Sequence, residues 1–208
     1  TGSVRQLTTQ VLGIKQFAWS PDGRWIAFVV ERSPETFAHQ PVLVGIDDQP
    51  RGELWIVDTE SGDVRPIPVE GSVGGFDLWF SDTIGWSPDS RQIGFSLRPH
   101  GGAGSHLDAD IAVADRETGS VVRVVQRPGM DVYPQWSPDG RRLAFITTQG
   151  RRDWVTGSAI EVIDLGSGQI ETVSRGYDDK IKEFLWKPDG SGFCFLAPRG
   201  VRSALFEI

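Results

Sequence analysis

The chain of 208 residues has few of the residues that form disulfide bonds or bind metal ions, with one cysteine and three histidines. Its single cysteine, Cys194, has no partner for an internal disulfide, and this slightly favours a reducing compartment such as the cytoplasm. No cysteine pair and no His-Glu-x-x-His motif occur, so the strong signatures of a zinc site are missing. We therefore expect no metal and no other cofactor.

Long apolar runs and an excess of positive charge are also missing. No stretch of about 18 apolar residues occurs, so the sequence predicts no membrane-spanning helix and no membrane partner. The 28 acidic and 21 basic residues give a net charge of −7, with both signs scattered along the chain. Because nucleic-acid binding favours a basic patch or stripe, we expect no nucleic-acid partner.

The common catalytic motifs are absent as well. The sequence has no Gly-x-Ser-x-Gly nucleophile elbow, no P-loop and no Gly-x-Gly-x-x-Gly dinucleotide motif. We therefore predict that this chain by itself catalyses no reaction.

What the sequence does contain is a repeat. Residues 136–140 read Trp-Ser-Pro-Asp-Gly, and close copies begin at Trp19, Trp86 and Trp186. The steps between these tryptophans are 67, 50 and 50 residues. Repetition at such a period is typical of propellers, solenoids and other arrays.

Each copy of this repeat has the composition of a tight turn between two strands. Proline presets φ at the second turn position, serine and aspartate bond to nearby backbone, and glycine supplies a positive φ. A large-small-large apolar triplet follows every copy, at residues 26–28, 93–95, 143–145 and 193–195. The second copy has Ser90 where the others have glycine, and since serine is strained at positive φ we expect this turn to bend.

A second repeat lies between the copies of the first. A short apolar strand ending in Asp58, Asp115 or Asp164 is followed by a Ser/Thr-Gly turn and another strand. Each unit then has four strands, A to D, with tight A–B and C–D hairpins, as in a propeller blade. The predicted fold is all-β: a β-propeller with four blades of four antiparallel strands, or a segment of a larger propeller.

We predict a single domain, residues 1–208. Its blades lie at about 10–68, 80–125, 132–173, and 182–208 completed by 1–9. Residues 1–9 resemble a D strand and the fourth blade lacks one, so residues 3–8 are expected to pair with strand C of a fourth blade. The pairing closes one ring within a molecule, or exchanges strands between two copies; an open segment is the third alternative.

All the long connections are B–C or D–A loops, and these share one end of the blades. Loops on a rigid scaffold often carry function, so we expect any binding site at this elaborated face. The candidate binding residues lie in or beside these loops: Asp48, Arg51, His100, His106, Asp108, Asp110, Arg151 and Arg152.

Each candidate also has a plainer interpretation. The two histidines with Asp108 and Asp110 match no metal-site spacing, so a solvated loop is the simpler hypothesis. Arg151 and Arg152 could hold a carboxylate or belong to an exposed loop. Cys194 occupies the small position of the apolar triplet, which indicates a packed residue rather than a reactive thiol.

The sequence Trp-Ser-Pro-Asp-Gly-x-x-Ile-Ala-Phe, with the later Ile-x-Val-x-Asp-x-x-[Ser/Thr]-Gly, resembles the TolB-type propeller repeat over nearly the whole chain. The same repeat builds the N-terminal propeller of prolyl-oligopeptidase-family serine peptidases, including the dipeptidyl peptidase IV and acylaminoacyl-peptidase types. The resemblance specifies the fold much more strongly than the function.

The resemblance implies a non-catalytic propeller domain that controls substrate access to a serine peptidase. Its expected partner is a catalytic α/β-hydrolase domain or another protein, with peptides as ligands. The first alternative is a TolB-like protein-interaction scaffold, and the second is a self-contained propeller enzyme with an axial site. The sequence specifies neither substrate, native blade count nor oligomeric state.

Overall fold

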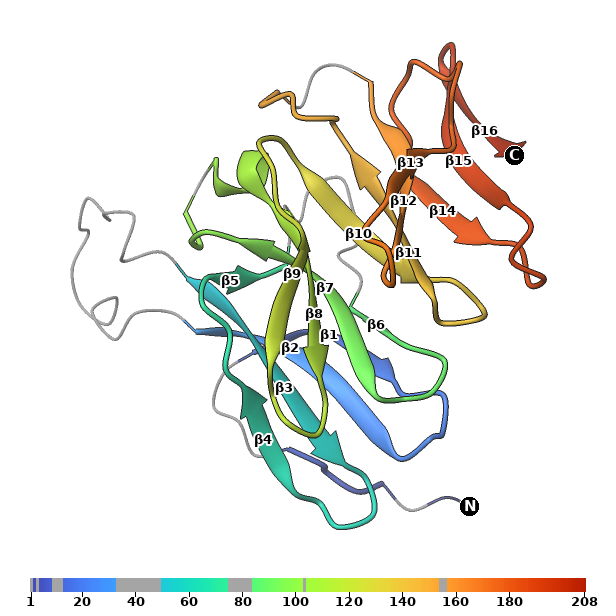
Figure 1. Ribbon diagram of the computed structural model, residues 1–208. Helices are drawn as coiled ribbons and strands as arrows, with labels where there is room; N and C mark the ends of the chain where they lie inside the picture. Colours follow the sequence, from blue (N-terminus) through green and yellow to red (C-terminus); the bar gives the residue numbers. More distant parts are fainter. Residues whose placement is uncertain are drawn as a thin grey trace.

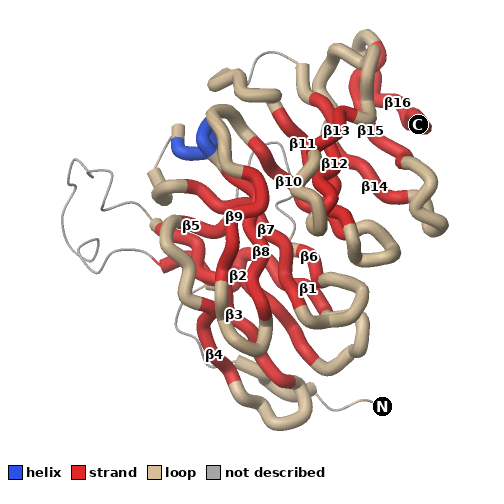
Figure 2. The backbone as a smooth tube through the Cα atoms, viewed as in Figure 1, coloured by secondary structure: helices blue, strands red, loops and turns tan. Residues whose placement is uncertain are grey.

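The computed structural model describes residues 2, 4–8, 13–32, 50–74, 84–102, 104–153 and 157–208. Its strands form four antiparallel sheets that follow one another in chain order (Figure 1). Strands dominate the described part of the chain, and one short 3₁₀ helix, η3 (Ser105–Asp108), accompanies them (Figure 2). The predicted all-β fold with four propeller-type sheets is confirmed.

Blades one and three each have four strands in the order A-B-C-D. Blade one consists of β1 (Ile14–Trp19), β2 (Trp25–Arg32), β3 (Arg51–Asp58) and β4 (Val64–Ile67). Blade three consists of β10 (Asp131–Trp136), β11 (Arg142–Thr147), β12 (Ala159–Asp164) and β13 (Ile170–Thr172).

Blades two and four depart from this pattern. In blade two the A strand is divided into β5 (Ser72–Val73) and β6 (Gly85–Trp86). Both pieces pair with β7 (Gln92–Arg98), which β8 (Asp110–Asp115) and β9 (Val121–Val125) follow. Within the residues that the structure describes, blade four comprises β14 (Glu183–Trp186), β15 (Phe193–Arg199) and β16 (Arg202–Glu207).

The predicted pairing of residues 3–8 with blade four is absent from the described part of the chain. Residues 4–8 contain no strand. Leu7 instead packs on blade one, against Ile26, Phe28, Val30 and Val57. Among the described residues, the N-terminal segment therefore covers part of the first blade, and no fourth strand pairs with β16.

The Trp-Ser-Pro-Asp turns are held by the hydrogen bonds that their residue types predict. In blade three the Ser137 hydroxyl donates to Asp139 at 2.6 Å and accepts from the Arg142 N–H at 3.0 Å. Asp139 in turn accepts from the Arg141 N–H at 3.1 Å. These bonds hold the pKa of Asp139 below its usual value, with the serine hydroxyl as the largest cause. The same pattern occurs in blades one and two.

The expectation that Ser90 bends its turn is wrong. Its φ is 61°, close to 71° at Gly23 and 70° at Gly140. The Ser90 N–H donates to the Ser87 carbonyl at 2.9 Å, as glycine does in the other turns. The Ser90 hydroxyl accepts a hydrogen bond from the Asp22 N–H of blade one at 3.0 Å, and this bond offsets the backbone strain.

The repeat tryptophans join each blade to the one before it. The indole N–H of Trp86 donates to the Ala18 carbonyl at 3.0 Å, and that of Trp136 to the Gly85 carbonyl at 3.0 Å. Trp186 makes the equivalent bond to Gln135 at 3.1 Å. In every case the acceptor is the residue directly before the preceding blade's repeat tryptophan. The same kind of hydrogen bond therefore sets the register between blades at all three seams.

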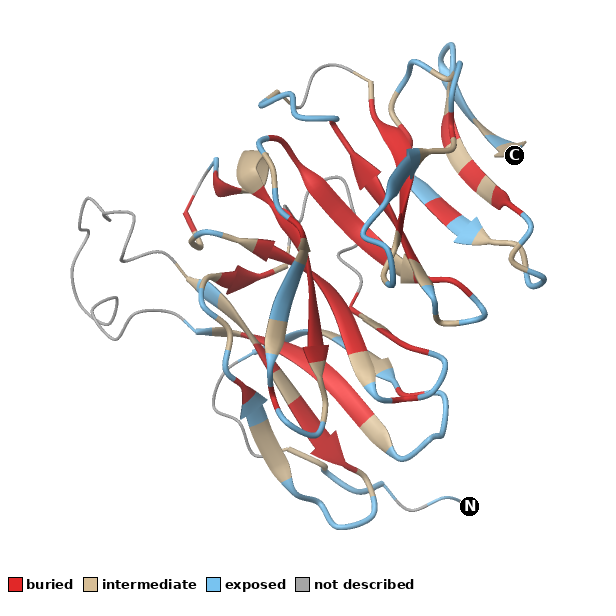
Figure 3. Cartoon of the chain, in the orientation of Figure 1, coloured by how far each residue is buried: buried red, intermediate tan, exposed pale blue. Residues whose placement is uncertain are grey.

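The small residue of the second apolar triplet, Gly94, makes room for the indole of Trp136 in the next blade. A Cβ at Gly94 would lie 3.1 Å from Trp136 Nε1 and 3.4 Å from Leu143 Cδ2. Buried side chains therefore concentrate on the central strands and in the seams, whereas exposure increases toward the outer strands (Figure 3). Burial of these apolar faces is the main source of stability, at about 25 cal/mol per Å².

We predict that Gly140→Val destabilises the chain more than Gly168→Ser does. Both glycines have a positive φ, 70° and 72°, but a Cβ at Gly140 would lie 3.3 Å from Cδ of Pro88 in the neighbouring turn. Nothing lies within 4 Å of the same position at Gly168. The valine variant should lose on the order of 1–3 kcal/mol more in urea unfolding. Equal urea midpoints and equal slopes of the unfolding free energy for the two variants would contradict this packing.

A second prediction concerns Ser90. Ser90→Ala keeps the strained backbone and removes the acceptor for the Asp22 N–H, so the free energy of unfolding should fall by about 1–2 kcal/mol. Ser90→Gly loses the same bond but relieves the strain, and its unfolding free energy should stay close to the wild-type value. Denaturant unfolding of the two variants measures the difference, and the reverse order would exclude this account.

Candidate binding site at the long-loop face

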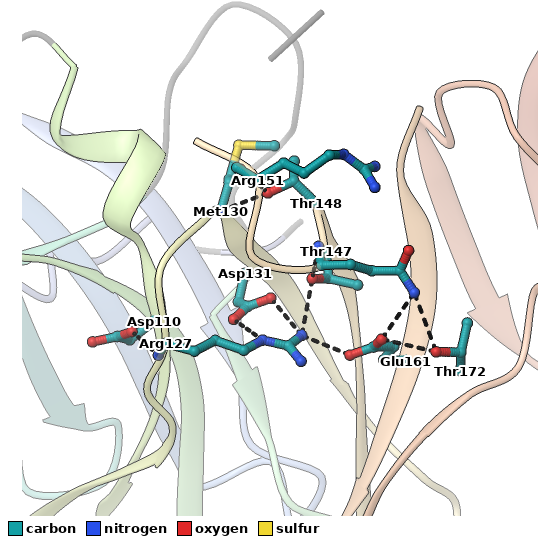
Figure 4. Close-up of polar contacts among 10 residues, drawn as sticks. Asp110, Arg127, Met130, Asp131, Thr147, Thr148, Arg151, Glu161 and Thr172 are labelled. Atoms are coloured by element: carbon teal, nitrogen blue, oxygen red, sulfur yellow. Dashed lines mark hydrogen bonds and ion pairs between the residues drawn. The ribbon is translucent and has the colours of Figure 1, made fainter. Parts of the chain in front are cut away.

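The long connections and the short turns lie at opposite ends of the sheets, because neighbouring strands run in opposite directions. At the long-loop end, charged side chains from blades two and three meet in a polar cluster, defined here as Arg127, Asp131 and Glu161 with their bonding partners (Figure 4). Arg127 lies in the connection between the two blades, Asp131 begins β10, and Glu161 lies within β12.

Arg127 is the centre of the cluster. Its Nε and Nη2 donate to the two carboxylate oxygens of Asp131 at 3.0 and 2.9 Å, a bidentate pairing. Nη2 also donates to Thr147 Oγ1 at 2.9 Å and to Glu161 Oε2 at 2.6 Å. The guanidinium lies 5.7 Å from the ring centre of Phe145. Both carboxylates are buried, with side-chain exposures of 1% and 6%, while Arg127 retains 28%.

Polar groups around these three residues satisfy the remaining hydrogen bonds. Glu161 Oε1 accepts from Thr172 Oγ1 at 2.8 Å and from Gln149 Nε2 at 3.2 Å. Gln149 has a φ of 54°, and its N–H donates to Thr147 Oγ1 at 2.8 Å. These bonds hold the Gln149 side chain in place within its loop.

The electrostatics follow from burial and from these bonds. Burial is the largest influence on Asp131, and it raises the pKa of this carboxyl. Burial acts in the same direction on Glu161, but hydrogen bonds from Arg127, Thr172 and Gln149 together outweigh it and lower the pKa of Glu161. Burial opposes the charge on Arg127, and its bonds to Asp131 and Glu161 more than compensate and raise its pKa. The guanidinium therefore stays charged.

The structure brings four of the predicted site residues to this region. Arg152 forms an ion pair with Asp108, which joins the B–C connections of blades two and three. Asp110 is buried at the start of β8, where it pairs with Arg123 at 2.7 Å and accepts from the Arg127 N–H at 3.3 Å. Arg151 Nη2 donates to the Gly157 carbonyl at 2.6 Å.

The structure describes three of the other four predicted residues. His100 accepts from the Gly102 N–H at 3.0 Å within its own loop. His106 is half-buried in η3, and burial followed by the positive charge of Arg98 lowers its pKa. Arg51 begins β3 of blade one, opposite Arg32. Asp48 lies outside the described residues.

The sequence analysis missed the residues at the centre, Arg127, Asp131 and Glu161. One signal was available, because Glu161 stands within the apolar strand Ala159–Asp164, where blades one and two have Trp55 and Ala112. A carboxylate in the middle of a buried strand needs a cation or several donors nearby. Arg127 could not be chosen from the sequence, since its loop is short and other arginines lie in longer loops.

Metal sites and membrane-spanning helices can both be searched for in the described structure. Among the described residues, no group of three or more His, Cys, Asp or Glu side chains is arranged to hold a metal ion. In the same part of the chain, no helix has the length and apolar character needed to cross a membrane. The polar cluster provides charged hydrogen-bonding groups beside the B–C connections of blades two and three.

Comparison with solved structures identifies the fold. TolB from Acinetobacter baumannii superposes with a TM-score of 0.64 at 20% identity, covering 97% of this chain and 43% of that one. The fold is that of a TolB-like β-propeller. A prolyl endopeptidase structure matches this propeller fold with a TM-score of 0.63 at 21% identity, covering 95% of this chain and 27% of that one. No family model matches the sequence.

Among curated proteins, dipeptidyl-peptidase 5 of Porphyromonas gingivalis is 30% identical to this propeller over 132 residues. The match covers 61% of this chain and 19% of that protein. The propeller thus spans less than half the length of each of these three similar proteins. It resembles the propeller domains of TolB and of prolyl-oligopeptidase-type peptidases.

We predict that Arg127→Met destabilises the propeller by about 3 kcal/mol near neutral pH, because it leaves two buried carboxylates without their cation. Burial would then raise both folded-state pKa values above the unfolded ones. Stability that depends on such groups is present at low pH and is lost as the pH rises through the raised values. The loss should therefore be larger at about pH 8 than at about pH 5.

The matched control is Arg32→Met, which removes an exposed pair with Glu53 at 2.6 Å. Surface pairs of this kind contribute little, so the control should change stability only slightly at either pH. Equal losses for the two variants, or a loss of stability for Arg127→Met that grows toward acid pH, would contradict the assigned role.

Proposed function

We propose that this chain is the non-catalytic propeller domain of a prolyl-oligopeptidase-type peptidase, where it controls which peptides reach a separate α/β-hydrolase domain. The observation that supports this most is the 30% identity to a segment of a dipeptidyl-peptidase, because the solved peptidase and TolB structures, at 20–21% identity, are likenesses in fold. The sequence has no nucleophile elbow of its own, so the chemistry would belong to the hydrolase domain.

The long-loop face would be the surface that meets the peptide or the hydrolase domain. Its two B–C connections are tied by the Asp108–Arg152 pair, and the polar cluster anchors the strands below them. Arg152 keeps 64% of its side chain exposed while paired, so its guanidinium remains accessible to a peptide carboxylate. A rigid base with accessible charged groups at its rim is suited to select ligands by charge and length.

A TolB-like interaction scaffold is the second candidate function. The structure of Acinetobacter TolB, which covers 97% of this chain, favours it. In this alternative the same face binds another protein, and no peptidase activity accompanies it.

The test is the peptidase activity of the polypeptide encoded by the complete open reading frame, measured with a dipeptidyl nitroanilide and with a longer peptide. Arg152→Glu should change the ratio of kcat/KM values for the two substrates by about three- to tenfold, since it alters only the selecting surface. Glu60→Lys, at the exposed C–D turn of blade one on the opposite end, should leave that ratio unchanged.

The isolated 208-residue chain should hydrolyse neither substrate. A complete polypeptide without peptidase activity and without a hydrolase segment would reject the peptidase proposal and favour the scaffold. A ratio that responds to Glu60→Lys but not to Arg152→Glu would show that the short-turn face does the selecting.

A further inference from the structure

The ion pair between Asp108 and Arg152 uses little of the bonding capacity of either group. Arg152 Nη2 donates one hydrogen bond to Asp108 Oδ2. Among the described residues, the two charged groups make no other hydrogen bond. The side chain of Arg152 is 64% exposed and that of Asp108 is 33% exposed. The guanidinium therefore has further N–H donors that no group of the described structure occupies.

A second exposed pair, in blade one, shows the contrast. Arg32 Nε lies 2.6 Å from Glu53 Oε1, and Arg32 Nη2 donates to Glu53 Oε2 at 3.4 Å. Trp55 Nε1 also donates to Glu53 Oε2, at 3.1 Å. The exposures of 60% and 30% are close to those of Arg152 and Asp108. A guanidinium can hold a carboxylate by two parallel bonds, and at similar exposure Arg152 has that capacity left.

Backbone hydrogen bonds hold Asp108 in place independently of Arg152. Asp108 ends η3, and Ala109 follows it. The Ala109 carbonyl accepts from the Asp131 N–H at 2.8 Å. The side chain of Asp131 is in turn held by its two bonds from Arg127. The position of Asp108 is therefore set by the polar cluster and the backbone next to it.

The other partner of the pair is anchored in the same way. The Met130 N–H donates to Thr148 Oγ1 at 2.9 Å, and that hydroxyl donates to the Arg151 carbonyl at 2.6 Å (Figure 4). The Arg151 N–H donates to the Thr148 carbonyl at 3.2 Å. Arg152 directly follows this turn. Since exposed ion pairs contribute little to stability, the two loops keep their places whether or not the pair is closed.

The buried carboxylates of the neighbouring polar cluster are each compensated by an arginine. Asp131 and Glu161 are 1% and 6% exposed, while their common partner Arg127 is 28% exposed. Asp110 is 6% exposed and its partner Arg123 is 32% exposed. In every pair the cation is the more accessible group. These three carboxylates therefore do not strongly repel a carboxylate that approaches from solvent.

We propose that Asp108 occupies the place of a ligand carboxylate, and that Arg152 binds a carboxylate of a peptide by releasing Asp108. This carboxylate belongs to an acidic side chain or to the C-terminus of the peptide. Asp108 acts as a built-in competitor, which lowers the apparent affinity by the fraction of molecules in which the pair is closed. The peptide nature of the ligand rests on the proposed function, whereas the exchange of one carboxylate for another rests on the bonds described above.

Fluorescence anisotropy with the polypeptide encoded by the complete open reading frame tests this exchange. A serine-directed fluorophosphonate is added first, so that no probe is cleaved. Three labelled, N-acetylated hexapeptides share one sequence: the first has central glutamates and a C-terminal amide, the second has glutamines and a free C-terminal carboxylate, and the third has glutamines and an amide. Wild type should bind the first or the second at least about threefold more tightly than the third, and the preferred peptide identifies the source of the carboxylate.

Two variants of the pair should change binding in opposite directions. Asp108→Asn removes the competitor, so the preferred carboxylate peptide should bind about two- to sixfold more tightly. Arg152→Gln removes the cation, so the preference over the neutral peptide should disappear. Glu53→Gln, the matched control in blade one, should bind like wild type. Unchanged circular dichroism and melting temperature show that each variant still folds.

A wild type that binds all three peptides equally overturns the proposal. So does an Asp108→Asn variant that fails to bind more tightly, because a merely structural pair would lose affinity in both variants. Hydrolysis of the two substrates named above is measured separately, on untreated protein. Opposite effects of the two pair variants in a polypeptide without peptidase activity would support the exchange and reject only the peptidase proposal.

Discussion

The bond from an indole N–H to a backbone carbonyl is the constraint on which the arrangement of sheets depends. It recurs at 3.0, 3.0 and 3.1 Å in the three seams, always to the residue before a repeat tryptophan. Trp86 and Trp136 are buried, and an indole N–H that lost its acceptor there would cost free energy, so this bond favours one register between neighbouring blades. The repeated turn sequence is therefore more than a hairpin signal, because it also carries the contact that joins consecutive blades.

The contacts between neighbouring blades differ at the two ends of the sheets. At the short-turn end, neighbouring turns touch through small and rigid residues, such as Gly140 against Pro88, and the contacts repeat from blade to blade. At the long-loop end, the seam between blades two and three holds Arg127, Asp131 and Glu161, which no other described seam repeats. Buried ion pairs often add little net stability. A cluster of this kind is better explained as a means of positioning the loops above it.

The sequence predicted what is local and repeated. Strand pairs, tight turns and four sheets follow from residue spacing and turn chemistry alone, and the structure confirms them. It did not predict that Ser90 would keep a left-handed backbone, because the compensating Asp22 N–H lies 68 residues away. Arg127 was missed for the same reason, since its partner Glu161 lies 34 residues further along the chain. Four of the predicted candidates lie at the same end of the blades as the cluster, but the residues at its centre were not among them.

This division explains why a repeat can specify a fold so strongly and a function so weakly. The residues that repeat, tryptophan, proline, aspartate and glycine, are committed to turns and seams and have few polar groups left for a ligand. The residues with accessible charge, such as Arg152, lie in connections where the blades differ from one another. A similar fold at 20% identity therefore transfers the scaffold to TolB and to peptidases alike. We propose that the long loops select what this chain binds, with side chains that the scaffold positions but does not choose.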